Sequence, residues 1–223
     1  MFRISHRATA LIDDLVEKAV EWVDSQRDAH RASAFPLPEP ERTLIAPFFT
    51  GKTLSQVRFR HIPEIENPAV LGFVEDSDGR PLDFSQMAGI TFNDTVVLSD
   101  AYFEETDLVS LLFHECVHVA QYQQLGVEGF MRSYVEGWVS NGMDYFAIPL
   151  ERDAYDLERQ FRAAPNRPFS VEGAIALTTN DDANDDSAHA TIVNNCSICS
   201  GGVGLNFAAS TVEGNLTATA TTG

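Results

Sequence analysis

The fold of this 223-residue chain is decided by the stretch Asp107-Leu-Val-Ser-Leu-Leu-Phe-His-Glu-Cys-Val-His-Val-Ala-Gln-Tyr-Gln-Gln-Leu-Gly126. The stretch predicts one helix. Thr106 or Asp107 can cap its start, because a short polar side chain accepts hydrogen bonds from the free N–H groups of a first turn. Gly126 can adopt the left-handed conformation that often follows a helix end. The helix has apolar side chains to bury, namely Leu108, Leu111, Leu112, Val119 and Leu125.

Within this helix, His114-Glu115-Cys116-Val117-His118 reads H-E-x-x-H. Residues four apart lie on one face of a helix, so the imidazoles of His114 and His118 can reach one metal ion. Glu115 lies beside them, where its carboxylate can take a proton from a water activated by the metal. We therefore predict that both histidines bind Zn²⁺ and that Glu115 is the catalytic base. The alternative is two ordinary histidines on an amphipathic helix.

A catalytic zinc ion usually takes three protein ligands, so a third must come from elsewhere in the chain. The position six residues after the motif is Gln124, so the pattern with a third His is absent. A later segment, residues 149–161, predicts a helix with proline at its first position and acidic residues in its first turn. We predict that Glu151 of this helix is the third ligand, with Asp153 and Glu158 as the alternatives.

The H-E-x-x-H motif with a downstream Glu resembles the gluzincin metallopeptidases. Among them, the chain is most similar to a small bacterial H-E-x-x-H domain of unknown function, often linked to extracellular contractile injection systems. The resemblance covers roughly residues 57–161. It includes Gln121, three residues after the second His, and a Leu-Glu-x-x-Ala signature at Leu150–Ala154. It implies an α+β, minimal zincin-like fold, zinc held by His114, His118 and Glu151, and hydrolysis of a peptide or protein substrate.

The chain departs from related peptidases at one position. They often place an Asp four residues after the ligand Glu, where it orients a metal-bound His. Here that position is Tyr155, and Asp156 comes one residue late. The competing hypothesis is therefore a catalytically weak or inactive zincin-fold module that acts in docking or secretion-system assembly.

Tyr145, near the start of the Glu151 helix, is the candidate oxyanion donor, with a purely structural Tyr as the alternative.

The remaining segments surround this centre. We expect an N-terminal part, residues 1–40, with an amphipathic helix over 7–31 and a proline-rich connector. The metallopeptidase domain, residues 41–177, should contain a small, mostly antiparallel sheet and an aromatic-rich helix over 127–142 that belongs to the core. Residues 178–223 are low in complexity and predict a disordered tail. The strands should be a single one at 56–62 and two hairpins, at 70–82 and at 89–98 around Asn93-Asp94.

Charge and hydropathy exclude several classes of partner. The formal net charge is −18, from 33 acidic and 15 basic residues, so nucleic acid would be repelled. The chain contains no run of apolar residues long enough to predict a membrane span.

Localisation and cysteine use follow from shorter signals. Asp13 and Asp14 interrupt the apolar stretch that a secretory signal would need, so we expect a cytoplasmic protein, with export by a dedicated, signal-less system still possible. We expect Cys116 to be a small buried apolar residue. Cys196 and Cys199 lack the second pair that would complete a zinc site, which favours free thiols or a local disulfide in the tail.

Overall fold

The computed structural model describes residues 6–67, 83–101 and 107–181, and the fold over these residues is α+β and mostly helical, as predicted. Three short 3-10 turns, η1 (Ala46–Phe48), η3 (Phe84–Gln86) and η5 (Tyr145–Ala147), lie between the larger elements. The larger elements in chain order are α1 (His6–Arg31), α2 (Glu39–Ile45), α3 (Gly51–Gln56), β1 (Arg58–Ile62), β2 (Gly89–Phe92), β3 (Thr95–Ser99), α4 (Leu108–Ser140), α5 (Pro149–Ala163) and α6 (Val171–Asp181).

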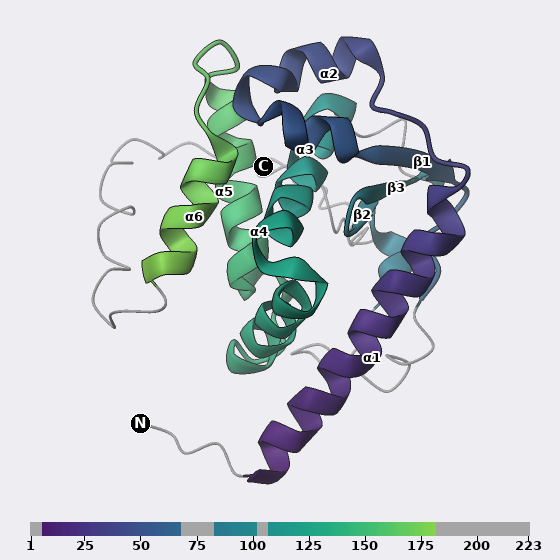
Figure 1. The fold of residues 1–223 in the computed structure, drawn as a ribbon, viewed down its shortest axis with the longest axis vertical. Helices are drawn as coiled ribbons and strands as arrows, with labels where there is room; N and C mark the ends of the chain where they lie inside the picture. The colour runs from purple at the N-terminus through teal and green to yellow at the C-terminus, as the bar shows by residue number, and fades with distance from the viewer. Residues whose placement is uncertain (1–5, 68–82, 102–106, 182–223) are drawn as a thin grey trace, which may run out of the picture.

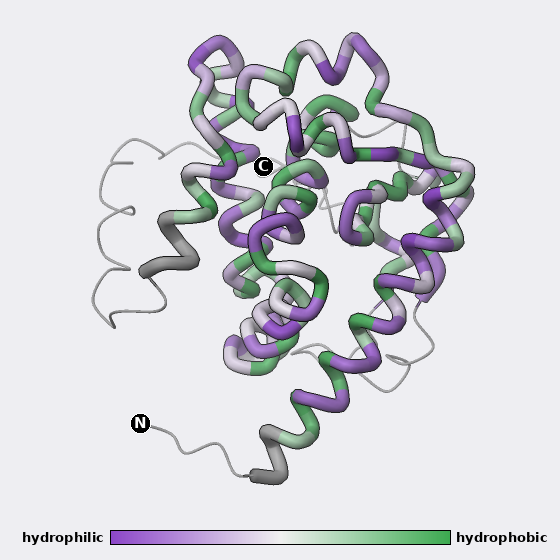
Figure 2. The backbone as a smooth tube through the Cα atoms, in the orientation of Figure 1, coloured by the Kyte–Doolittle hydropathy of each residue, from purple (hydrophilic) through white to green (hydrophobic). Residues whose placement is uncertain are grey.

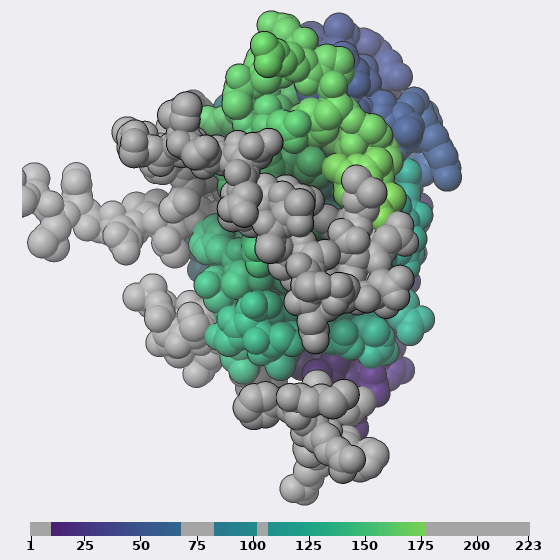
Figure 3. All heavy atoms as spheres, turned by 90° about the vertical axis from the view of Figure 1, so that its left-hand side faces the viewer, coloured from purple at the N-terminus to yellow at the C-terminus, as the bar shows by residue number. Residues whose placement is uncertain are grey.

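Helix α4 runs through the middle of the molecule (Figure 1). Helices α5 and α6 lie on one side of it, and the sheet and α1 lie on the other. The hydropathy colouring of α1 alternates along its length, as expected for a helix with one buried face (Figure 2). From the side, α6 lies above the second half of α4 on the same face (Figure 3). The H-E-x-x-H motif, in the first half of α4, lies between these two groups of elements.

The described sheet has three strands in the order β1-β3-β2, and it is mixed. Strands β2 and β3 form the predicted antiparallel hairpin, and Asn93 takes a φ of 59° in its two-residue loop. Strand β1 pairs with β3 in parallel, so the prediction of a mostly antiparallel sheet is wrong for these residues. The reason is topological, since the long segment that separates β1 from β3 lets the chain enter both strands from the same end.

Helix α4 begins where the sequence predicts and bends at the predicted glycine. The side chain of Asp107 accepts hydrogen bonds from the backbone N–H groups of Val109 and Ser110 and so caps the first turn. Gly126 has φ 70° and ψ 169°, a conformation that is almost exclusive to glycine, and α4 changes direction there. In the first half, residues 110–122, including Cys116, are buried, whereas the second half carries the predicted aromatic stripe of Phe130, Tyr134 and Trp138.

Helix α5 is held against both halves of α4. Phe161 stacks on Phe113 at a ring-centroid distance of 4.4 Å, which fixes the C-terminal part of α5 beside the motif. At the other end, a Cβ atom on Gly137 would lie 2.6 Å from the Pro149 ring, so a glycine is needed for the two helices to come this close. These contacts fix the position of Glu151 along α4.

Helix α1 packs on the second half of α4 and on the sheet. Val16, Ala19 and Val23 are buried, and Trp22 meets Phe92 edge to face at 5.1 Å. The helix is amphipathic, as predicted, although the apolar residue Leu11 is 60% exposed.

Three helices differ from expectation. Helix α2 begins within the predicted connector, α3 includes the first residue of the strand predicted at 56–62, and α6 continues through residues 178–181, which we predict as tail. The predicted hairpin at 70–82 and the cysteine pair in the tail lie outside the described residues. None of the described helices is both long and apolar enough to cross a membrane.

Candidate metal centre

The structure brings together three ligand atoms from α4 and α5. The Nε2 atoms of His114 and His118 lie 3.1 Å apart. Oε2 of Glu151 lies 3.5 Å from the first and 3.4 Å from the second. All three side chains are buried, and no described residue donates a hydrogen bond to Glu151 Oε2. Among the described residues, this trio is the group that can hold a metal ion.

The far side of the His118 ring is fixed by Gln121. Nδ1 of His118 donates to Oε1 of Gln121 at 2.8 Å, and Nε2 of Gln121 donates to the carbonyl oxygen of Leu150 at 3.0 Å. With its proton on Nδ1, the ring directs the lone pair of Nε2 toward His114 and Glu151. One amide side chain therefore orients a ligand and links it to the helix that carries the third ligand.

The far side of the His114 ring faces Glu158, whose Oε2 lies 3.3 Å from His114 Nδ1. Glu158 is therefore not one of the three converging groups, and neither is the other alternative, Asp153. A residue two turns beyond Glu151 lies on the same face of α5, so Glu158 places a carboxylate beside His114 although position 155 is a Tyr. Tyr155 instead packs its ring against His114 at a centroid distance of 4.5 Å.

Three buried carboxyl groups lie beside the two histidines of this centre. Glu115, Glu151 and Glu158 are buried and no described Lys or Arg is, although the partly exposed Arg162 donates to Glu158 Oε1 at 3.4 Å. Burial raises the pKa of Glu151, but His118 and His114 outweigh it and hold that pKa well below its usual range. Burial lowers the pKa of His114, but Glu151 and Glu158 raise it to about 10. The carboxylates of Glu151 and Glu158, which favour a positive charge on His114, would also favour a divalent cation at this position.

The carboxyl group of Glu115 contacts strand β2. The hydroxyl of Thr91 donates to Glu115 Oε2 at 2.7 Å, and burial raises the pKa of this carboxyl. Strand β2 passes so close that a Cβ atom on Gly89 would lie 2.8 Å from Glu115 Oε1. The carboxylate is thus held by a hydrogen bond on one oxygen and by close packing on the other.

Besides Tyr155, two tyrosines lie near the candidate metal centre, and the sequence indicates one of them. Tyr145, the predicted oxyanion donor, lines a cavity that Glu115, His118 and Glu151 also line. Tyr134 donates a hydrogen bond to Glu151 Oε1 at 2.9 Å, a role that we do not predict from the sequence. Its regular spacing with Phe130 and Trp138 predicts a core stripe, and only the bend at Gly126 shows that the stripe also faces Glu151.

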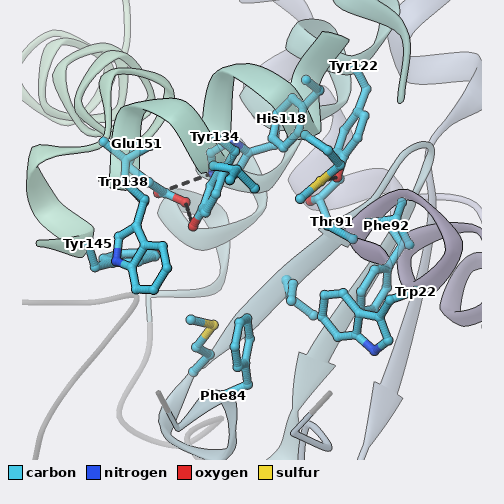
Figure 4. Close-up of a pocket in the computed structure, with 18 of the residues that line it drawn as sticks. Trp22, Phe84, Thr91, Phe92, His118, Tyr122, Tyr134, Trp138, Tyr145 and Glu151 are labelled. Atoms are coloured by element: carbon cyan, nitrogen blue, oxygen red, sulfur yellow. Dashed lines mark hydrogen bonds and ion pairs between the residues drawn. The ribbon is translucent and has the colours of Figure 1, made fainter. Parts of the chain in front are cut away.

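A cavity of about 120 Å³ adjoins the metal ligands (Figure 4). Glu151, Tyr134 and His118 lie at one end of it, and Trp22, Phe92 and Phe84 lie toward the other. The site therefore combines a cluster of ligands and a buried carboxylate with an adjacent space large enough for a small group.

Comparison of this chain with protein-family models, curated proteins and solved structures finds no match. The functional assignment therefore depends on the residues and on the geometry of the metal centre.

Proposed function

We propose that this protein is a zinc-dependent metallopeptidase with a minimal zincin-like fold. One observation carries the proposal, namely the buried convergence of His114, His118 and Glu151, with the buried carboxyl groups of Glu115 and Glu158 nearby. Two imidazoles and one carboxylate are the ligand set of a well-known class of catalytic zinc sites, which leave a position open for water or substrate.

The residues around the ligands suit peptide hydrolysis. Zinc, when bound, supplies Lewis-acid chemistry, since it acidifies water and polarises a carbonyl group. Glu115 accepts the proton of the attacking water and later delivers it to the leaving amine. Thr91 holds one oxygen of this carboxylate throughout. The proton released by the attacking water thus has a defined acceptor, the Glu115 carboxylate.

Tyr145 is the candidate donor to the oxyanion that develops on the substrate carbonyl. Burial and the negative charge of Glu151 raise its pKa well above the usual value, so the phenol keeps its proton. Tyr134 is already engaged with Glu151, which leaves Tyr145 as the better candidate of the two.

The substrate class follows from the sheet. Strand β2 is an edge strand of the described sheet, and its residues Gly89–Phe92 line the cavity beside Glu115. An edge strand can pair with an extended peptide through main-chain hydrogen bonds. We therefore propose a peptide or protein substrate.

The burial of the ligands favours one second candidate. His114, His118 and Glu151 are only 1%, 6% and 3% exposed, and a polypeptide needs more access than this to reach them. A zinc-containing module with little or no turnover, which serves docking within an assembly, would be consistent with such a closed site.

Metal content and cleavage separate the two candidates. We expect the purified protein to hold one zinc per chain, measured by mass spectrometry, and to cleave members of a peptide library. Glu115→Gln should keep the zinc and lose about 10²–10⁴-fold in cleavage rate, because it removes the base. Glu128→Gln, the same change at an exposed position of α4, should cleave normally.

Three results would count against the peptidase. If the protein holds zinc but shows no cleavage that depends on Glu115, the result would support the docking module. Absence of stoichiometric zinc would exclude both candidates. Zinc that survives His118→Ala at full stoichiometry would show that the metal lies elsewhere.

A further inference from the structure

The wall of the cavity beside the metal ligands has two chemically different parts. Its acidic and basic groups, Glu115, His118 and Glu151, all belong to the metal centre. The rest of the wall is formed almost entirely by apolar and aromatic side chains from α1, the η3–β2 segment and the second half of α4. A group that extends from the metal into this space would therefore leave water for an apolar environment.

The size of the cavity limits what it can accept. Its volume is about 120 Å³. An apolar cavity of roughly 150 Å³ is known to bind a single benzene ring. The space beside the metal therefore suits one aromatic ring or one branched aliphatic side chain, and it is too small for several residues of a peptide.

Helix α1 supplies the part of the wall that limits this space. Ala19, which is 9% exposed, lines the cavity with only a methyl group, so any larger side chain there would occupy the cavity itself. Trp22 lines it with an indole ring that is held edge to face by Phe84 at 5.6 Å and Phe92 at 5.1 Å. Figure 4 shows Trp22 and Phe92 side by side, away from the ligands His118 and Glu151.

We infer that α1 is part of the substrate-binding site, and that Ala19 and Trp22 select a substrate with one aromatic or branched aliphatic side chain beside the scissile bond. The inference rests on the proposed peptidase function and extends it to the substrate. Ala19 sets the depth available to the side chain, and Trp22 provides an aromatic surface for it. The N-terminal helix thereby determines specificity for a reaction whose ligands and base all come from α4 and α5.

Binding of a matched pair of inhibitors tests this inference without a need for turnover. The probes are two peptide hydroxamates that chelate zinc and differ only in a benzyl or a methyl side chain. Their dissociation constants are measured by calorimetry on the zinc-loaded protein. We expect the benzyl compound to bind roughly ten- to a hundred-fold more tightly, because the ring is buried in an apolar pocket.

Substitutions on α1 test whether this helix causes the preference for the benzyl compound. Ala19→Phe fills the cavity, so it should weaken the binding of the benzyl compound by roughly ten-fold or more. The binding of the methyl compound should stay nearly unchanged. Ala29→Phe makes the same change at an exposed position of α1 and should affect neither compound. If Ala19→Phe does not fold, Ala19→Leu should give a smaller loss in the same direction. Trp22→Phe enlarges the space and should improve the binding of a naphthylmethyl analogue relative to the benzyl compound.

The inference is overturned if wild-type protein binds both hydroxamates equally, or if Ala19→Phe weakens both to the same degree. It is overturned as well if Ala29→Phe reproduces the effect. Zinc-loaded protein that binds neither compound would overturn the peptidase proposal too, whereas equal binding of both would leave that proposal intact.

Discussion

At the scale of single residues, Gly89 is the position where the sheet meets Glu115, the proposed catalytic base. Its missing side chain lets β2 pass close to Glu115, whose carboxylate accepts a hydrogen bond from Thr91 two residues further along the strand. Any side chain at this position would compete with Oε1 for the same space. The placement of the proposed base therefore depends on a glycine in a different element.

Gly89→Ala should displace the carboxylate of Glu115 without disturbing the metal ligands. The new Cβ atom would lie 2.8 Å from Oε1, and the end of the side chain can move while the backbone stays. A misplacement on the order of 1 Å costs roughly 10²-fold in catalysis. We expect the cleavage rate to fall by about this factor while zinc content, measured by mass spectrometry, remains at one per chain.

Gly51→Ala is the matched control, since a Cβ atom there meets nothing within 4 Å. It should change neither the rate nor the zinc content. Wild-type activity in Gly89→Ala would show that the position of this carboxylate is not critical.

At the scale of elements, the bend in α4 determines what its second half can reach. The half before Gly126 carries both histidines, and the half after it carries Tyr134, which donates to Glu151 on α5. The conformation at Gly126, φ 70° and ψ 169°, is one that residues with a side chain rarely adopt. One backbone angle pair therefore places the two halves of α4 on either side of the Glu151 carboxylate.

Gly126→Ala should destabilise the protein by about 1–3 kcal/mol, the usual range for a side chain forced into such a conformation. A Cβ atom at Gly126 meets nothing within 4 Å, so the whole effect would come from the backbone. Urea unfolding of the zinc-loaded protein measures it. Gly129→Ala, three residues later, should instead stabilise by up to about 1 kcal/mol, because alanine favours a regular helix. Equal effects of the two changes would mean that the bend is not fixed by glycine.

Local signals account for the elements that the sequence predicts. Asp107, Gly126 and Pro149 mark helix ends, and Asn93-Asp94 marks a hairpin, because each acts through its own backbone or its nearest neighbours. These signals are enough to place His114, His118 and Glu151 on two helices.

The remaining features depend on contacts between distant segments. The parallel pairing of β1 with β3 joins parts of the chain that no local pattern connects. Among the side chains of α6 that the structure describes, Val171 and Ile175 are buried, too few for a periodic signal. Glu158 faces His114 only because α5 packs along α4 through the Phe113–Phe161 stack. The hydrogen bond from Tyr134 to Glu151 could not be predicted either, because it depends on the bend at Gly126.

At the scale of the whole molecule, α1 is attached to the body at two places. Near its C-terminal end, Arg27 donates to Asp94 in the β2–β3 loop at 2.8 Å, and Arg31 lies 3.3 Å from the same carboxylate. Near its N-terminal end, Asp13 accepts a hydrogen bond from Arg132 of α4 at 2.9 Å, on the exposed surface. The apolar face of α1 lies between these contacts, so the helix is held along much of its length.

Asp94→Asn should destabilise the protein by about 1–2 kcal/mol, within the range for hydrogen bonds to charged groups once partial exposure is considered. Burial raises the pKa of Asp94, but Arg27 and Arg31 outweigh it and lower that pKa. The carboxylate therefore contributes its full stability above about pH 4, near the unfolded-state pKa, and loses it as the pH falls through the lower folded-state pKa.

Urea unfolding at neutral pH and again at low pH measures both effects. The difference between wild type and Asp94→Asn should shrink as the solution is acidified below about pH 4. Asp28→Asn is the control, because Asp28 contacts the same Arg27 but its side chain is 80% exposed. A variant at Asp94 as stable as the wild type would show that α1 is held by its apolar face alone.

The burial of the three proposed ligands should also determine the rate of metal exchange. A chelator as large as EDTA cannot reach an ion enclosed by side chains that are 6% exposed or less, so release has to wait for α4 and α5 to separate locally. The rate of zinc loss should rise with chelator concentration only at first and then level off. The plateau would report how often the two helices part, a frequency set by the stacked rings of Phe113 and Phe161 and by the Gln121 bridge rather than by the affinity of the ligands.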